Sequence, residues 1–318
     1  MKTHKIVFMF SGQGSQYFQM AKALYRRDPV FTEWLDRLDQ MVIGLLGKSV
    51  IDTVFSPDKK IGDPFDCLEL SHPAIVMWEY ALAQMLIEDG IEPDFVFGTS
   101  LGEYVAAAVA GILPVEDVLR LIVEQAEIVL SHCPEGRMLT ILDSPRLFHR
   151  HAYLRQHSEL ASVNYHSHFV VSGAPADISA ICAHLKTADI THQVLPVPFA
   201  FHSSLVDEAE IPFLNAVGQA RHFNSPEFPY ISGVKGTEAE EFDAAYFWDV
   251  VRQPIRLPEA VEFLEAGGPC AYVDLGPSGT NANFVKHNLP EDAVSKCFPI
   301  ITPFGGELKR LEAFKKFI

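Results

Sequence analysis

The chain has 318 residues, of which 48% are hydrophobic and 21% are charged, as in a folded globular protein with a large core. Its 41 acidic and 25 basic residues give a formal net charge of −16, which argues against nucleic acid as a partner because phosphates would be repelled. Five widely spaced cysteines are typical of reduced thiols in a cytoplasmic protein rather than of a disulfide framework.

The N-terminal segment predicts a buried strand. Residues 6–10 form a continuous apolar run of the kind found in a parallel sheet covered on both faces. This run is too short for a signal peptide or a membrane span, so we expect a cytoplasmic protein without membrane contact. The polar loop 11–16 follows, and helical patterns then continue to about residue 90.

The segment 98–102 fits the pattern G-x-S-x-G between a predicted strand at 93–97 and a predicted helix at 101–110. Glycines on both sides allow the sharp turn that exposes a nucleophilic serine at the end of a strand. Ser100 is therefore the candidate nucleophile. The alternative is a purely structural turn, since this pattern alone is a weak signal.

The pattern changes between residues 136 and 197, where strands and helices are expected in the order β-α-β-β-α-β. The expected elements are strands at 138–142, 160–163, 169–172 and 192–197, and helices at 147–157 and 177–187. This order predicts a ferredoxin-like small subdomain. It would be inserted into a large α/β-hydrolase-like domain with a parallel sheet, formed by 1–135 and 198–318 and ending in a helix at 307–318.

A serine nucleophile needs a base, and His202 stands out among thirteen histidines. It ends the apolar run 197–201, where the chain returns to the large domain, so a loop there can deliver an imidazole to the cleft. The group that holds the imidazole tautomer is a carboxylate or a neutral acceptor.

Six ordered motifs resemble those of the malonyl-CoA:acyl-carrier-protein acyltransferases, including the acyltransferases of polyketide synthases. The motifs are Phe-Ser-Gly-Gln-Gly-Ser-Gln at 10–16, Gly-Thr-Ser-Leu-Gly-Glu-Tyr at 98–104, Asn164 with Val-Val-Ser-Gly at 170–173, Ala-Phe-His-Ser at 200–203, Arg-Gln-Pro-Ile-Arg at 252–256 and Asp-Leu-Gly-Pro at 274–277.

The resemblance implies two subdomains with a cleft between them and assigns roles to matching positions. Ser100 would be the nucleophile and His202 the general base, while Gln13 and the backbone N–H of Leu101 would form the oxyanion hole. The carbonyl of Gln253 would orient the histidine, which makes a Ser-His dyad without an acid.

Two positions depart from the family pattern. Thr99 stands where the family usually has histidine, and Gln125 stands where an arginine pairs with the carboxylate of malonyl groups. A glutamine offers a neutral amide in place of a charged fork, so we expect a pocket for uncharged acyl groups, shaped also by Phe201 and Asn164. Gln125 belongs to one predicted helix face, formed by Val118, Leu121, Ile122, Gln125 and Val129.

Glutamine at this position resembles a branch found beside polyketide synthases whose modules lack their own acyltransferases, and the segment 276–286 is similar to it as well. Members of that branch hydrolyse stalled acyl groups from the phosphopantetheine arm of acyl carrier proteins. This implies an acyl hydrolase that works through a Ser100 acyl-enzyme, as a monomer without metal or cofactor. The alternative is an acyltransferase that moves malonyl or another acyl group from CoA or a carrier protein to a carrier protein.

Other interpretations stay open at this point. Arg120 or Arg137 could replace the missing arginine. A lipase or esterase of the α/β-hydrolase class uses the same G-x-S-x-G motif, although its fold has no ferredoxin-like insert, and a noncatalytic carrier-protein scaffold is the other alternative. Histidines of the small subdomain could hold a metal, although no carboxylate or cysteine completes a set. Two basic groups could meet an acidic protein: Arg146, Arg150 and Lys186 in one, and Lys309, Arg310, Lys315 and Lys316 in the other.

Overall fold

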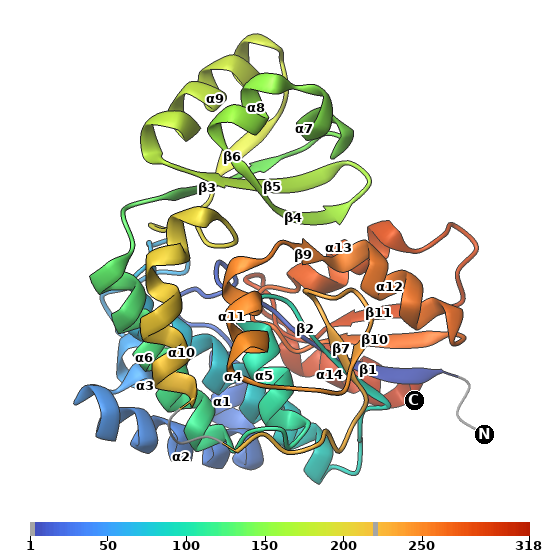
Figure 1. Ribbon diagram of the computed structural model, residues 1–318. Helices are drawn as coiled ribbons and strands as arrows, with labels where there is room; N and C mark the ends of the chain where they lie inside the picture. The colour runs from blue at the N-terminus through green and yellow to red at the C-terminus, as the bar shows by residue number, and fades with distance from the viewer. Residues whose placement is uncertain (1–3, 219–221) are drawn as a thin grey trace.

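The computed structural model describes residues 4–218 and 222–318, in which a six-stranded sheet forms the centre of the large domain (Figure 1). The strand order is β11-β10-β1-β2-β7-β8, parallel except for β8, which runs antiparallel to β7. The strands are β1 (Lys5–Phe10), β2 (Phe95–Gly98), β7 (Tyr230–Ser232), β8 (Glu238–Ala239), β10 (Cys270–Asp274) and β11 (Lys296–Pro299).

Both faces of the strand β1 are buried, as its continuous apolar run predicts. Alternate side chains point to opposite faces of a strand, so Phe8 and Phe10 pack in one core and Val7 and Met9 in the other. The first core contains most of the N-terminal helices, and the second contains helices that follow residue 256. Two apolar layers therefore hold the strand whose carboxyl end leads into loop 11–16.

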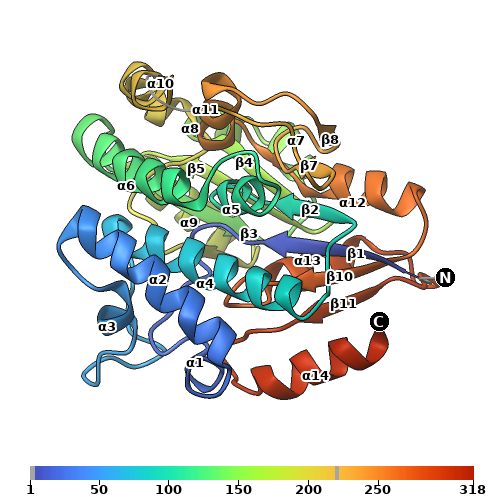
Figure 2. The same ribbon diagram turned by 90° about the horizontal axis from the view of Figure 1, so that it is seen from below.

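The helices α2, α4 and α6 pack against one another and lie together on one side of the large domain (Figure 2). No helix within the described ranges is both long and apolar enough to cross a bilayer. The helices of this domain are α1 (Lys22–Arg27), α2 (Pro29–Leu46), α3 (Val50–Val54), α4 (Leu68–Glu88), α5 (Gly102–Val109), α6 (Val115–His132), η1 (Ser204–Ala209), α10 (Glu210–Gly218), α11 (Ala244–Arg252), α12 (Leu257–Ala266), α13 (Thr280–Asn288) and α14 (Glu307–Phe317).

A small subdomain projects from the large domain and carries a second sheet (Figure 1). Its elements are β3 (Arg137–Ile141), α7 (Arg146–Arg150), α8 (Ala152–His157), β4 (Glu159–Tyr165), β5 (His168–Gly173), α9 (Pro175–Thr187) and β6 (His192–Val194). The order β6-β3-β5-β4 with antiparallel neighbours is ferredoxin-like. The short strand β9 (Ile255–Arg256) of the large domain then adds to β4 in parallel.

We propose to divide the chain as the sequence suggests, with 136–197 as the small subdomain and 1–135 with 198–318 as the large domain. Residues 1–3 and 219–221 of these ranges lie outside the described residues.

Two predicted elements of the small subdomain were wrong in extent. The helix expected at 147–157 is divided into α7 and α8 by extended backbone at His151. Phe148 and Leu154 both pack in the subdomain core, yet six residues would place them about 120° apart around one continuous helix. The break turns both side chains inward. The strand expected at 192–197 ends at Val194, shortly before Pro196, which lacks a ladder N–H.

Candidate active site

Ser100 lies on a sharp turn between β2 and α5, with its backbone in the left-handed region at φ 53°. The flanking glycines are required by close packing. A Cβ at Gly102 would lie 2.2 Å from the carbonyl oxygen of Phe10, and a Cβ at Gly98 would lie 2.4 Å from the Cα of Glu103. The turn therefore has the geometry of a nucleophile elbow pressed against β1.

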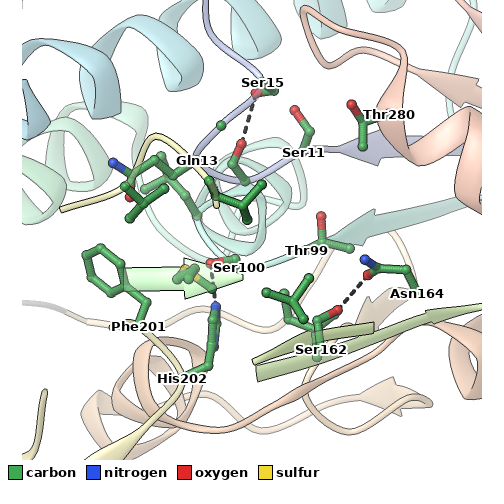
Figure 3. Close-up of a pocket in the computed structure, with 18 of the residues that line it drawn as sticks. Ser11, Gln13, Ser15, Thr99, Ser100, Ser162, Asn164, Phe201, His202 and Thr280 are labelled. Atoms are coloured by element: carbon green, nitrogen blue, oxygen red, sulfur yellow. Dashed lines mark hydrogen bonds between the residues drawn. The ribbon is translucent and has the colours of Figure 1, made fainter. Parts of the chain in front are cut away.

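The loop that follows β1 rests against this elbow. A Cβ at Gly12 would come within 2.9 Å of the Ser100 Cβ and 3.5 Å of the Leu101 nitrogen, so only glycine allows the approach. The next residue, Gln13, lies near Ser100 in Figure 3. Its two buried side-chain amide atoms find no hydrogen-bond partner within the described chain.

The imidazole of His202 lies between Ser100 and a backbone carbonyl. Its Nε2 is 3.0 Å from the Ser100 Oγ, and its Nδ1 is 2.7 Å from the carbonyl oxygen of Gln253 (Figure 3). A carbonyl oxygen only accepts, so Nδ1 carries the proton and Nε2 can accept from the serine hydroxyl. This is the arrangement of a nucleophile and its general base.

The neutral state of His202 follows from its surroundings. The residue is 2% exposed, and burial lowers its imidazole pKa to about 4, with a further lowering from the nearby Arg252 charge. The hydrogen bond to Gln253 partly opposes this shift. Like Ser100, His202 has a positive φ, at 60°, and its N–H donates to the carbonyl of Val251. Backbone strain at both positions persists because the surrounding chain holds them.

The serine and the histidine open into a cavity of about 350 Å³ between the large domain and the sheet of the small subdomain. Among the described residues that line it, none is a lysine, an arginine, an aspartate or a glutamate. Gln13, Leu101, Thr99, Asn164 and Phe201 all line this cavity. The space therefore suits an uncharged group, with polar contacts supplied by hydroxyls, amides and imidazoles.

Gln125 also lines the cavity and is 4% exposed. Its Oε1 accepts a hydrogen bond of 2.6 Å from the Tyr104 hydroxyl, which fixes the amide on α6. Neither alternative cation lines this space: Arg120 faces Asp117 at 4.0 Å on the outside of the same helix, and Arg137 contacts the carbonyl of Gly136.

The remaining predicted residues make contacts within the cavity wall. The Thr99 hydroxyl lies 3.3 Å from both the Phe10 carbonyl and the Asn281 Oδ1. Asn164 accepts from Ser162 through Oδ1 (Figure 3), and its Nδ2 lies 3.0 Å from the His168 Nδ1. Gln253 acts through its main chain, so its side-chain identity is secondary in this geometry.

Sequence reasoning missed His72, which lies in α4, is 2% exposed and lines the cavity. Its ring faces that of Phe201 at a centroid distance of 6.2 Å. The available signal was a histidine in a helix that is apolar on all sides, where a polar side chain requires a partner. Among the described residues, those of the small subdomain included, no group of three or more His, Cys, Asp or Glu side chains could hold a metal ion.

The α/β sheet, the inserted subdomain and the serine–histidine pair define the class of enzymes that act on acyl thioesters. A family model described as an acyl transferase domain matches residues 7–301, and the chain belongs to this family.

Similar proteins agree with this assignment. The chain is 45% identical over 312 residues to the polyketide biosynthesis acyltransferase homolog PksD of Bacillus subtilis (strain 168), covering 98% of this chain and 96% of that protein. It is 46% identical over 313 residues to the homolog BaeD of Bacillus velezensis, with the same coverage. A loading acyltransferase from the avermectin modular polyketide synthase has a TM-score of 0.88 at 25% identity, covering 98% of this chain and 99% of that one.

Proposed function

We propose that this protein is a serine-dependent hydrolase that removes uncharged acyl groups from the phosphopantetheine arm of acyl carrier proteins in polyketide biosynthesis. The observation that carries the proposal is the uncharged lining of the cavity, with Gln125 at the position where the family resemblance expects an arginine. The names of the two Bacillus relatives supply the polyketide context.

The uncharged lining of the cavity supports a preference against malonyl groups on energetic grounds. A carboxylate buried there would have no cation to pair with, because Gln125 presents a neutral amide, whose Oε1 accepts from Tyr104. Breaking a buried ion pair by removing one partner costs about 3 to 5 kcal/mol. This corresponds to a loss of about a hundredfold or more in malonyl handling.

The dyad supports a two-step reaction. The Ser100 Oγ attacks the thioester carbonyl and gives its proton to the His202 Nε2, while Gln13 and the Leu101 N–H stabilise the oxyanion. The carbon–sulfur bond breaks, and the protonated histidine returns the proton to the departing thiol. Water then attacks the acyl-serine ester with His202 as base, and the proton passes to Ser100 as the carboxylic acid leaves.

The second candidate function is acyl transfer, in which a thiol replaces water in the second step. The family match favours acyl transfer, because the matching model is described as an acyl transferase domain. The same dyad can serve both outcomes. An uncharged acyl group without an ionic anchor leaves room for water near His202, and for this reason we favour hydrolysis.

The proposed partner is an acyl carrier protein, which carries the thioester on its phosphopantetheine arm, so no further cofactor or metal is required. Of the two basic groups, the C-terminal one is largely engaged: Lys315 pairs with Asp89, Lys316 with Glu312, and Arg310 donates to the Ile300 carbonyl. We therefore propose Arg146, Arg150 and Lys186 of the small subdomain as the docking group for an acidic carrier protein. We expect a monomer in the cytoplasm.

Intact-mass spectrometry tests the proposed function. The protein is mixed with malonyl-CoA and with acetyl- and butyryl-loaded carrier protein, and Ser100 acylation and free acid are followed over time. We expect little malonylation and rapid loss of the neutral acyl groups to water. Stable malonylation followed by transfer to carrier protein would instead establish the acyltransferase function.

The variant Gln125→Arg tests the role of the cavity charge. We expect the malonyl-enzyme to accumulate at least about tenfold more than in wild type, since arginine restores a partner for the carboxylate. The matched control is Gln125→Met, which has a similar volume and also loses the bond to Tyr104 but adds no charge. Equal malonylation of both variants, or an unchanged acyl-enzyme lifetime in Gln125→Arg, would count against the proposal.

A further inference from the structure

His72 is a buried polar side chain that the reaction steps leave unused. It is 2% exposed, lines the same cavity as Ser100, and its buried Nδ1 finds no hydrogen-bond partner among the described residues. A buried nitrogen without a partner lowers stability, because it has lost its hydration without a replacement. The imidazole ring also lines the cavity, so a ligand bound there would contact it.

A second histidine in the same cavity shows that this state is specific to His72. His168 also lines the cavity, but its Nδ1 lies 3.0 Å from the Asn164 Nδ2 and is satisfied within the protein. Gln13 has unpaired amide atoms as well, but the proposed oxyanion hole accounts for them. His72 is therefore the polar group of this cavity that still requires an explanation.

The surroundings of His72 restrict what can bind to it. Burial lowers the imidazole pKa to about 4, so the ring is neutral at pH 7 and presents one donor and one acceptor nitrogen. The cavity lining described here offers no cation for a carboxylate and no anion for an amine. The Phe201 ring, at 6.2 Å, supplies an apolar wall for a carbon chain. A hydroxyl on an uncharged chain matches this combination, because it can donate or accept.

We propose that His72 recognises a hydroxyl substituent on the acyl chain, so that the enzyme prefers hydroxyacyl thioesters to alkyl thioesters of the same length. This inference rests on one part of the proposed function, namely that the cavity holds the acyl group. It does not depend on whether the acyl group then passes to water or to a thiol. A site with a buried hydrogen-bonding group discriminates against the ligand that leaves this group unpaired.

The test compares butyryl-pantetheine with its 2-, 3- and 4-hydroxybutyryl analogues. The kcat/KM is measured by release of the free thiol, which hydrolysis and transfer share, and Ser100 acylation is followed by mass. In wild type we expect the best hydroxyacyl substrate to exceed butyryl by about tenfold or more. In His72→Leu this ratio should fall close to one, and His72→Gln should restore part of it.

Controls separate recognition from a structural role. His157→Leu, which removes a histidine that pairs with Asp177 away from the cavity lining, should keep the wild-type ratio. A fluorophosphonate label on Ser100 reports an intact dyad in every variant, independently of the acyl chain. If the fluorophosphonate does not label Ser100 in His72→Leu, that variant is set aside. The hydroxyacyl-to-butyryl ratios of wild type and of His72→Gln then test whether His72 recognises the hydroxyl.

Two results would overturn the inference. One is a wild-type ratio near one for every hydroxyacyl isomer, which would mean that an ordered water satisfies His72. The other is a ratio unchanged in His72→Leu, which would leave the residue a scaffold role. Failure of the hydrolase function is distinguishable, since thiol would then be released without free acid while the ratio still reports recognition.

Discussion

The proposed catalytic dyad and the proposed acyl pocket share one cavity but are built in different ways. The dyad comprises Ser100 and His202, whose positions are fixed by backbone: a left-handed turn at each residue and the carbonyl of Gln253. The acyl pocket, formed by His72, Tyr104, Gln125 and Phe201, is fixed by side-chain contacts between α4, α5, α6 and the segment that leads to His202.

This difference teaches how such an enzyme can change its substrate. Apart from the packed glycines Gly12, Gly98 and Gly102, a dyad held by backbone tolerates substitutions around it, because the main-chain contacts do not depend on neighbouring side chains. A pocket held by side chains can change its chemistry with a single substitution, as we propose for the glutamine at position 125. Substitutions in the acyl pocket should therefore alter selectivity, while substitutions in the dyad should abolish activity.

The largest expected effect is that of His202→Ala. We expect kcat/KM for a butyryl thioester to fall by about 10³-fold or more, because the serine loses its general base. The measurement is thioester cleavage, with thermal unfolding as the check on folding. The control His168→Ala removes another buried histidine of the cavity and should cost less than about tenfold. A small loss in His202→Ala would mean that the dyad assignment is wrong.

The second effect is a shift of the acidic side of the kcat/KM–pH profile to lower pH. Catalysis needs neutral His202, and burial lowers its pKa from about 6.5 to about 4, so kcat/KM should persist to about pH 5 and fall near pH 4. At pH 5 this retains about thirtyfold more neutral imidazole than an unshifted histidine would. A midpoint near 6.5 would show instead that water reaches the imidazole.

The same shift has a consequence for stability. Between about pH 4 and 6.5 the unfolded chain binds the proton that folded His202 rejects, so the free energy of unfolding rises with pH across this window. The contribution is fully present above pH 6.5 and is lost as the pH falls through 4. Chemical denaturation of wild type and His202→Asn at pH 5 and pH 7 measures it, and the pH difference should be smaller in the variant.

The smallest effect is expected for Gln253→Ala. Because His202 contacts the main-chain carbonyl, removal of the side chain should change kcat/KM by less than about threefold. The comparison variant is Gln253→Pro, which disturbs the main chain as well as the side chain. It deletes the N–H that donates to the Asp249 carbonyl at 2.7 Å, and it should reduce activity strongly. A large loss in Gln253→Ala would mean that the side chain itself orients the histidine.

Several features could be predicted from the sequence because they are local. The apolar run at 6–10 predicts β1, and the glycines around Ser100 predict the turn between β2 and α5. The first and last residues of helices and strands in the small subdomain were predicted less accurately. The break at His151 depends on which way Phe148 and Leu154 must turn to reach a shared core, and that is a tertiary requirement.

The sequence by itself determined the family, the order of the elements and the residue types at the elbow, because glycine patterns and apolar periodicity encode backbone geometry over a few residues. Only the tertiary structure placed His202 at 3.0 Å from a serine 102 positions away and set its tautomer through a main-chain carbonyl. Only the tertiary structure, too, brought His72 into the cavity wall without a partner for its Nδ1 within the described chain. These contacts join distant segments, and no local pattern records which polar atoms folding leaves unpaired.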